Sequence, residues 1–363
     1  MITLISFVIL LAILIFVHEF GHFIAARIAG VGVTKFSLGF GPKIIGKKIG
    51  ETEYVVSWIP LGGFVKLLGE SADEELTPED EKRSFLKQPT WKRILIILAG
   101  PGCNFLLALL IFIIVFMYGV PKLTADVGEM QKEFPASEAG MISGDKIISI
   151  DGKNIVYWEE IKPLVADASG KEVKVAVERD SVKKIFLIKP KLSKAKNMFS
   201  EEVPTYLIGI SPSGKFVIDR KNPWEASITA IQRTWEISKL TVVAVVKMFE
   251  GVISPRTLGG PIFIAQVAGE QVREGIIPFI FFMAILSINL GVINLFPIPV
   301  LDGGHIFFYL IEMVTRREIS VKVKEISQQI GFVLLLMLML FVIMIDIERL
   351  NFKVVNDVMK YFK

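Results

Sequence analysis

The sequence predicts a polytopic α-helical membrane protein with about four transmembrane helices, a membrane-dipping β-hairpin element and one inserted α/β domain. Hydrophobic residues make up 52% of the 363 residues, and the mean hydropathy of +0.55 is too high for a soluble protein of this size. A helix that crosses a bilayer needs roughly 20 apolar residues. Apolar runs of this kind lie at about 2–24, 94–118, 277–311 and 328–347, and the third is interrupted by prolines and glycines.

The distribution of basic residues predicts how these spans are oriented. Lysines and arginines are plentiful between the first two spans, from Arg27 to Arg93, and they recur between the last two. Both connections lie on one side of the membrane in any four-span topology, and basic connections stay in the cytoplasm. We therefore expect loops 27–93 and 316–327 to be cytoplasmic, and both termini and the region 120–276 to be extracytoplasmic.

The first span, 1–26, lacks a basic start and a clear small-residue cleavage site, so we expect a retained helix rather than a signal peptide. The next region, 27–93, contains the stretches FSLGFGPKII and YVVSWIPLGGFVKLLG. They are rich in β-branched and aromatic residues, which favours strands. They are also too apolar for an ordinary loop, so we expect a hairpin that dips into the membrane against protein or a water-filled cavity. The charged residues 71–90 predict a linker or a short surface helix starting at Thr77 and Pro78.

The second span, 94–119, contains the stretch AGPGCNF. Its Gly100-Pro101-Gly102 run predicts a helix that is loosened at this point. Asn104 needs a polar partner inside the bilayer, although a role in helix packing alone is equally compatible. Cys103 is the single cysteine, which excludes an intrachain disulfide and a thiolate metal cluster.

Residues 120–195 predict a small α/β domain. The stretch MISGDKIISIDGKNI contains a Gly-Asp turn, a strand and a hairpin turn at Asp151-Gly152. Two further strands follow in VKVAVERDSVKKIFLIKP, and ASEAG predicts a short helical turn. The region resembles a PDZ domain of the bacterial permuted kind, through Ala139, Gly140, Gly144, Asp145, Ile147, Ile150, Asp151 and Gly152. A PDZ domain binds an extended peptide by strand addition; the alternative is a spacer without a ligand.

The remaining regions are a linker and two further membrane segments. Residues 196–276 predict a linker strand and an amphipathic helix from Pro223, whose recurring charges favour the membrane surface over a weak fifth span. Residues 277–315 predict a broken third transmembrane segment. A short loop over 316–327 and a fourth helix with a C-terminal tail over 328–363 complete the chain.

The first span carries three polar groups, His18, Glu19 and His22. Two histidines four residues apart lie on one face of a helix, where both can coordinate one Zn²⁺. The glutamate beside the first histidine can take a proton from the attacking water. Only three histidines occur in the chain, and ionisable groups inside a membrane helix are rare and usually functional.

A catalytic zinc site needs a third protein ligand. The stretch NLFPIPVLDGGH, Asn294–His305, interrupts the third segment at Pro297 and Pro299. Asp302 and His305 are its ionisable groups, and the first and third spans run in the same direction, so a shared depth is expected. Either a carboxylate or an imidazole would serve as the ligand, and composition leaves the choice open.

Two motifs resemble those of the site-2 protease family. His18-Glu19-Phe20-Gly21-His22 is similar to its HExxH motif, and the run from Asn294 to Gly304 is similar to its NxxPxxxLDGG motif. Both are complete and in the family's order. The four spans, the PDZ-like domain, AGPGCNF and the membrane-dipping strands match as well, so the resemblance covers nearly the whole chain. The most similar subgroup is the bacterial RseP/RasP-type regulated intramembrane zinc metalloprotease, although this chain shows one PDZ-like unit where some members carry two.

The resemblance implies one Zn²⁺ per chain, held by His18, His22 and Asp302, with Glu19 as the catalytic base. It implies that Asn294 binds substrate or the oxyanion near the metal. We expect Pro297 and the strand edge at Gly39, Phe40 and Gly41 to contact substrate, and His305 and Asn104 to support the ligands.

The implied activity is hydrolysis of a peptide bond within or near the transmembrane segment of single-span membrane proteins, in the bacterial cytoplasmic membrane. The expected partners are substrates trimmed on the extracytoplasmic side, the lipid bilayer, and a peptide or protein terminus at the PDZ-like domain; no nucleic acid is expected. Anti-sigma factors, remnant signal peptides and peptide precursors are candidate substrates.

One alternative is a PDZ-bearing peptide-binding module with a non-catalytic metal site, which the intact Glu19 disfavours. The other is an ion or proton transporter, which the absence of an inverted repeat in the sequence disfavours.

Overall fold

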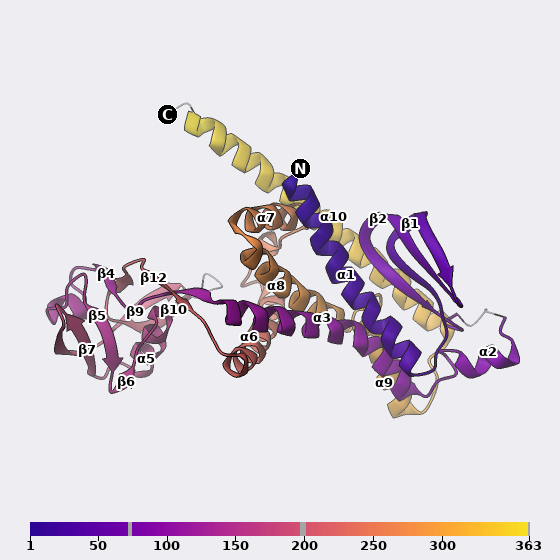
Figure 1. The fold of residues 1–363 in the computed structure, drawn as a ribbon, viewed down its shortest axis with the longest axis horizontal. Helices are drawn as coiled ribbons and strands as arrows, with labels where there is room; N and C mark the ends of the chain where they lie inside the picture. Colours follow the sequence, from indigo (N-terminus) through magenta and orange to yellow (C-terminus); the bar gives the residue numbers. More distant parts are fainter. Residues whose placement is uncertain (72–74, 197–200, 362–363) are drawn as a thin grey trace. The chain divides into compact units, whose positions relative to one another are not determined.

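The computed structural model describes residues 1–71, 75–196 and 201–361 (Figure 1). The chain divides into two compact units, Met1–Ile114 with Ser227–Lys363, and Val115–Ala226. Predictions for 72–74 of the charged linker, for 197–200 and for 362–363 lie outside the described residues.

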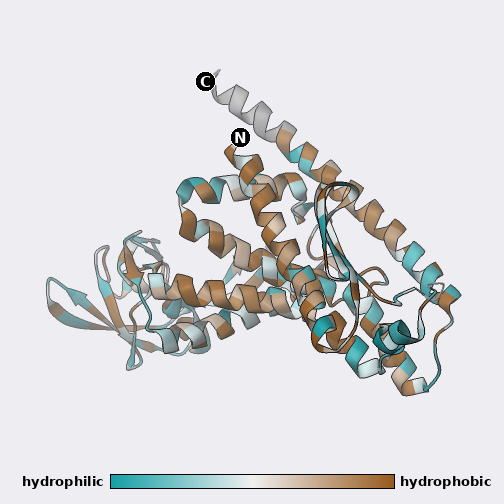
Figure 2. Ribbon diagram, turned by 45° about the vertical axis from the view of Figure 1, so that its right-hand side comes forward, coloured by the Kyte–Doolittle hydropathy of each residue, from teal (hydrophilic) through white to brown (hydrophobic). Residues whose placement is uncertain are grey.

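Four helices of the described residues are long and apolar enough to cross a membrane, as predicted. They are α1 (Ile2–Ile28), α3 (Thr90–Tyr118), α8 (Ile276–Asn294) and, within α10 (Val321–Tyr361), the part Val321–Leu350. Hydrophobic residues dominate these helices (Figure 2).

The predicted break in the third segment is confirmed, and it separates two helices. Helix α8 ends at Asn294, and α9 (Asp302–Thr315) begins after a turn. Pro297 and Pro299 lie in this turn, where a proline can neither donate a backbone N–H nor continue a helix. The break places Asp302 at the start of a new helix.

Strands β1 (Val33–Ile49) and β2 (Thr52–Leu67) form an antiparallel sheet. Residues 35–38 pair with 53–56 and also with 63–66, so the sheet is wider than a simple hairpin. Phe23 of α1 packs edge-on against Phe36 and Tyr54, which holds the sheet on α1. Its insertion into the membrane stays a prediction.

The substrate contact predicted for Gly39, Phe40 and Gly41 stays a prediction. Gly39 and Gly41 have φ angles of 92° and 87°, a conformation that glycine adopts without strain, so the chain bends here. Phe40 pairs with Ile59, and its ring stacks on Phe64 with centroids 6.3 Å apart. The segment is the bend that lets β1 pair twice with β2.

The predicted surface helix is confirmed as α2 (Pro78–Arg83). Thr77 is its N-cap, and its hydroxyl accepts a hydrogen bond from the backbone N–H of Asp80 at 3.2 Å.

Helix α3 runs unbroken through Gly100-Pro101-Gly102, although Pro101 cannot donate a backbone hydrogen bond there, and the predicted loosening stays a prediction. The glycines on this interface serve close packing. A Cβ atom on Gly21 of α1 would lie 2.2 Å from the carbonyl oxygen of Ala99 and 3.0 Å from the sulfur of Cys103. Helices α1 and α3 therefore approach each other more closely than larger residues would allow.

The second unit contains a four-stranded sheet of order β6-β5-β7-β8. Its strands are β5 (Lys146–Ile150), β6 (Lys153–Asn154), β7 (Val173–Arg179) and β8 (Val182–Ile188), with short helices α4 (Pro135–Glu138), η1 (Trp158–Glu160) and α5 (Ile161–Asp167). Asp151 and Gly152 have φ angles of 47° and 79° between β5 and β6, which confirms the predicted hairpin turn.

Asp145 anchors the turn before β5. Its buried carboxylate accepts hydrogen bonds from Arg179 Nε at 2.6 Å, Arg179 Nη2 at 2.7 Å and the backbone N–H of Ile142 at 2.9 Å. Burial would raise the pKa of this carboxyl, but these bonds outweigh burial and hold the pKa below its usual value.

The second unit extends beyond the predicted boundary at residue 195. Strands β9 (Lys191–Lys196) and β10 (Glu202–Leu207) pair with each other, while β11 (Ile210–Pro212) and β12 (Phe216–Asp219) pair with β4 (Val127–Met130) and β3 (Val120–Leu123). The strands after 195 are therefore part of this fold. The partners of β11 and β12 lie about 80–100 residues earlier in the chain, so local pattern could not reveal these two pairings.

Three helical segments follow: α6 (Pro223–Phe249), a short turn η2 (Pro255–Thr257) and α7 (Pro261–Glu274). The helix from Pro223 is confirmed, its place at the membrane surface stays a prediction, and α7 was not predicted separately. Buried Asp346 of α10 accepts backbone hydrogen bonds from Gly260, Ile262 and Phe263, which caps α7.

Candidate metal centre

Helix α1 brings His18, Glu19 and His22 to one buried site. The two imidazoles lie one turn apart, and their Nε2 atoms are 3.3 Å from each other. His18 and Glu19 are each only 9% exposed. Two imidazole nitrogens that face each other at this distance inside a membrane helix are typical of a metal site.

Asp302, the first residue of α9, completes the cluster. Its Oδ2 lies 3.2 Å from His18 Nε2, and its Oδ1 lies 3.5 Å from His22 Nε2. A Cβ atom on Gly303 would lie 2.3 Å from the carbonyl oxygen of Phe296, and one on Gly304 would lie 2.3 Å from that of Ile298. These glycines let α9 start directly against the preceding turn, which brings Asp302 to the histidines.

The separations among the three side chains fit a zinc ion. Ligand atoms at about 2.0–2.1 Å from a tetrahedral zinc lie about 3.3 Å apart, and those observed here are 3.2, 3.3 and 3.5 Å. Asp302 Oδ2 is buried and has no hydrogen-bond partner among the described residues. A divalent cation would neutralise the carboxylate and satisfy this oxygen.

Helix α3 fixes the orientation of both imidazoles. The Nδ1–H of His22 donates to the carbonyl oxygen of Ile96 at 3.0 Å, which leaves Nε2 free to coordinate. His18 Nδ1 lies 3.1 Å from the side-chain amide nitrogen of fully buried Asn104. Turning this amide by 180° lets Oδ1, which otherwise lacks a partner among the described residues, accept the Nδ1–H of His18.

The other predicted residues divide into those near the cluster and those away from it. Asn294, the last residue of α8, places its amide nitrogen 3.3 Å from His18 Nε2. Pro297 is exposed in the turn that follows. Gly39 and Gly41 lie in the bend of β1, outside the group of ligand atoms.

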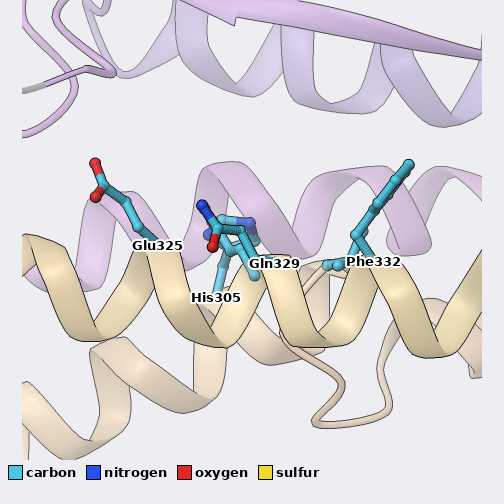
Figure 3. A pocket seen from close by; sticks show the side chains of 6 residues that line it. His305, Glu325, Gln329 and Phe332 are labelled. Atoms are coloured by element: carbon cyan, nitrogen blue, oxygen red, sulfur yellow. The ribbon is translucent and has the colours of Figure 1, made fainter.

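His305 lies on α9 one turn after Asp302 but outside the group formed by His18, His22 and Asp302. Its side chain lines a pocket of about 410 Å³ together with residues of α10 (Figure 3). Those residues are Glu325, Gln328, Gln329 and Phe332. Of the two candidates for a third ligand, Asp302 is the one that meets the histidines.

Sequence reasoning missed three residues around the site. A Cβ atom on Gly100 would lie 2.3 Å from His22 Nε2, so only glycine leaves room for the imidazole. Ser287 of α8 is fully buried and donates to the backbone carbonyl of Asn104 at 2.8 Å. Gly63 of β2 approaches Glu19, since a Cβ there would lie 3.0 Å from Glu19 Cγ. The AGPGCNF run contains Gly100 and could have indicated a close approach of two helices, but it was interpreted as a loosened helix.

Comparison with known families decides the class of enzyme. The model of peptidase family M50 matches residues 6–338. The chain belongs to peptidase family M50. The M50 proteins to which it is similar include two with provisional names as zinc metalloproteases. One, from Campylobacter jejuni, is 35% identical, with 94% of this chain and 92% of the relative covered. The other, from Clostridium acetobutylicum, is 35% identical, with 92% and 94% covered.

A third relative is the regulator of sigma-E protease RseP from Salmonella typhimurium, at 31% identity over 96% of this chain and 99% of the relative. This M50 peptidase is therefore a zinc metalloprotease of the site-2 protease family. Its four apolar helices make it a multi-pass membrane protein.

Proposed function

We propose that this chain hydrolyses a peptide bond within or near the transmembrane segment of single-span proteins of the bacterial cytoplasmic membrane. The observation that carries the proposal is the cluster of His18, His22 and Asp302, with separations of 3.2–3.5 Å that match a tetrahedral zinc. Its two histidines lie on α1, an apolar helix that can span the membrane. A proteolytic centre on a membrane-spanning helix acts on peptide bonds that lie in the bilayer.

Each residue has a distinct role in this reaction. His18, His22 and Asp302 hold one Zn²⁺, which supplies a Lewis acid that polarises the scissile carbonyl and activates water. Glu19 takes a proton from the attacking water and later gives it to the leaving amine. The Asn294 amide, 3.3 Å from His18 Nε2, donates to the oxyanion as it develops. Asn104 and the Ile96 carbonyl keep the imidazoles in place.

The substrate binds in an extended form beside β2. A helical substrate keeps its carbonyls in backbone hydrogen bonds, so it must unwind before attack. Residues 63–66 pair with 35–38 on one side. Gly63 approaches Glu19, since a Cβ atom there would lie 3.0 Å from Glu19 Cγ. Strand addition along 63–66 would bring an extended peptide to the catalytic base.

Strand addition predicts an alternating response to proline in the substrate. Every second N–H of an added strand bonds to the edge, and proline removes that donor. A scan of single prolines through the residues around the cleavage site should therefore block cleavage at alternate positions. The rates would be measured on a tagged single-span substrate. A response without period two would contradict strand addition.

The second unit is the extracytoplasmic, PDZ-like part of the chain in this proposal. The basic loops support this orientation, and the hairpin at Asp151-Gly152 belongs to the PDZ-like pattern. The unit binds a peptide or protein terminus that trimming of the substrate exposes. Anti-sigma factors and remnant signal peptides are the substrate types we propose.

Metal removal tests the proposed function. The chain would be assayed in membranes with a tagged single-span substrate that lacks its outer domain. We expect cleavage, its loss on treatment with a membrane-permeant chelator, and its recovery when Zn²⁺ is returned. Mass spectrometry of the products should locate the cut inside the apolar segment. Cleavage that persists after complete metal removal would contradict the proposal, and a cut only in the soluble part would contradict its intramembrane character.

A further inference from the structure

A second buried group of charges lies apart from the metal centre. It joins Arg93 near the start of α3, Glu312 near the end of α9 and Lys324 near the start of α10. Lys324 Nζ lies 2.7 Å from Glu312 Oε1, and Arg93 Nη1 lies 3.8 Å from Glu312 Oε2. We refer to Arg93, Glu312 and Lys324 as the three-helix ion cluster.

The cluster is held in place from several sides. The side chain of Glu312 is 5% exposed and that of Arg93 is 10% exposed. The backbone N–H of Ile319 donates to Glu312 Oε1 at 3.1 Å. The Arg93 guanidinium lies 4.6 Å, and the Lys324 ammonium 5.4 Å, from the centroid of the Tyr309 ring. Removing one member of a buried ion pair leaves an uncompensated charge, so a displacement of α9 that separates Glu312 from Arg93 and Lys324 is opposed.

On α3 and on α9, the charged residue lies at nearly the same axial distance from the residue that reaches the metal site. Asn104, which contacts His18, follows Arg93 by 11 residues, and Asp302 precedes Glu312 by 10 residues. At a rise of 1.5 Å per residue these are axial distances of about 16 Å and about 15 Å. The two helices run in opposite directions, with the ion cluster at one level and the metal site at another.

Continuous packing links the two levels. Ile96 and Ile97 of α3 belong to one hydrophobic cluster with Tyr309 and Ile306 of α9. At the metal end, by contrast, α9 starts without a side-chain cap and follows an exposed turn at Pro297 and Ile298. Asp302 contacts His18 and His22 at the metal end, and the three-helix ion cluster adds a second polar restraint on the axial position of α9 at its far end.

We infer that the three-helix ion cluster sets the depth of Asp302 relative to His18 and His22, so that Glu312 is a positioning residue for the metal site. This inference rests on the proposed function, because it takes Asp302 to be a zinc ligand. A slip of α9 by one helical turn would move Asp302 by about 5.4 Å. That exceeds the 3.2–3.5 Å that separates the donor atoms, so even a fraction of a turn would disrupt the site.

The affinity of the detergent-purified full chain for Zn²⁺ tests the inference. We expect Glu312→Gln to weaken binding by about 10- to 100-fold, the range typical of residues that orient metal ligands. Competition with a coloured chelator measures the affinity, and the absorption spectrum with Co²⁺ reports the coordination geometry. Arg93→Met should weaken binding similarly, and Arg93→Lys, which keeps the charge, should recover part of the loss.

Three controls separate positioning from general damage. Arg179→Met breaks the ion pair with buried Asp145 in the second unit and should leave Zn²⁺ affinity and the Co²⁺ spectrum unchanged. If Glu312→Gln fails to fold, Arg93→Met combined with Glu312→Met removes the two most buried charges together, and leaves only Lys324, whose side chain is 25% exposed, without its partner. This double variant should fold and still bind Zn²⁺ more weakly. Asp302→Ala should lose binding.

The outcomes distinguish the two proposals. Parent-like affinity in Asp302→Ala would overturn the proposed metal centre, and the positioning role with it. Loss in Asp302→Ala with parent-like affinity in the Glu312 variants would overturn the positioning role alone. Equal weakening by Arg179→Met would also overturn it, because the effect would then not be specific to α9.

Discussion

Glu19→Gln is expected to abolish peptide cleavage while Zn²⁺ stays bound. Glutamine has nearly the same size as glutamate, so His18 and His22 on the same helix keep their positions. It cannot take a proton from the attacking water, and general-base catalysis contributes about 10²- to 10⁴-fold to a rate. We therefore expect a fall in the cleavage rate of about this size, measured under single-turnover conditions with a single-span substrate.

The matched control for this variant is Glu318→Gln, at an exposed position of the same unit, which should cleave at the parent's rate. Metal content measured on the same samples separates loss of the base from loss of the site. Parent-like cleavage by Glu19→Gln would show that another group is the base. Loss of zinc together with activity would show that Glu19 is needed to build the site rather than to transfer protons.

Gly100→Ala is expected to disrupt the metal centre from the neighbouring helix. The added Cβ would lie 2.3 Å from His22 Nε2, 2.4 Å from His22 Cε1 and 3.0 Å from His18 Cε1. Because the first two distances are shorter than any non-bonded contact, the imidazole must turn away or α1 and α3 must separate. We expect Zn²⁺ binding to weaken by about 100-fold, the upper end of what changes around metal ligands cost, with a parallel loss of cleavage.

Gly102→Ala provides the control on the same helix. A Cβ at this position would meet nothing within 4 Å, and alanine is favoured over glycine in a helix by about 0.5–1 kcal/mol. This variant should bind Zn²⁺ normally and unfold at a slightly higher temperature. Normal zinc affinity in Gly100→Ala, or equal damage in both variants, would show that the close approach at Gly100 does not shape the site.

Local sequence was sufficient for the features that depend on neighbouring residues. The four apolar helices follow from composition and length alone. His18 and His22 share a helix face because of their spacing, and the turn at Asp151-Gly152 follows from residues that accept a positive φ angle. Thr77 identified the start of a helix through a hydrogen bond within its own first turn.

The choice between Asp302 and His305 shows where local sequence was insufficient. Both lie within one turn of the same helix, and both are of a type that binds zinc. The path of the turn after Asn294 and the packing of Gly303 and Gly304 bring Asp302 to the histidines, whereas His305 faces a pocket beside α10.

The sequence by itself therefore determined the membrane spans, the HExxH helix and the class of chemistry, because these depend on composition and short-range spacing. Only the tertiary structure decided the third ligand candidate, the close approach at Gly100, the bend at Gly39 and Gly41, and the partners of β11 and β12. Each of these depends on contacts between residues far apart in the chain, and neither hydropathy nor helical or strand periodicity carries information about such distances.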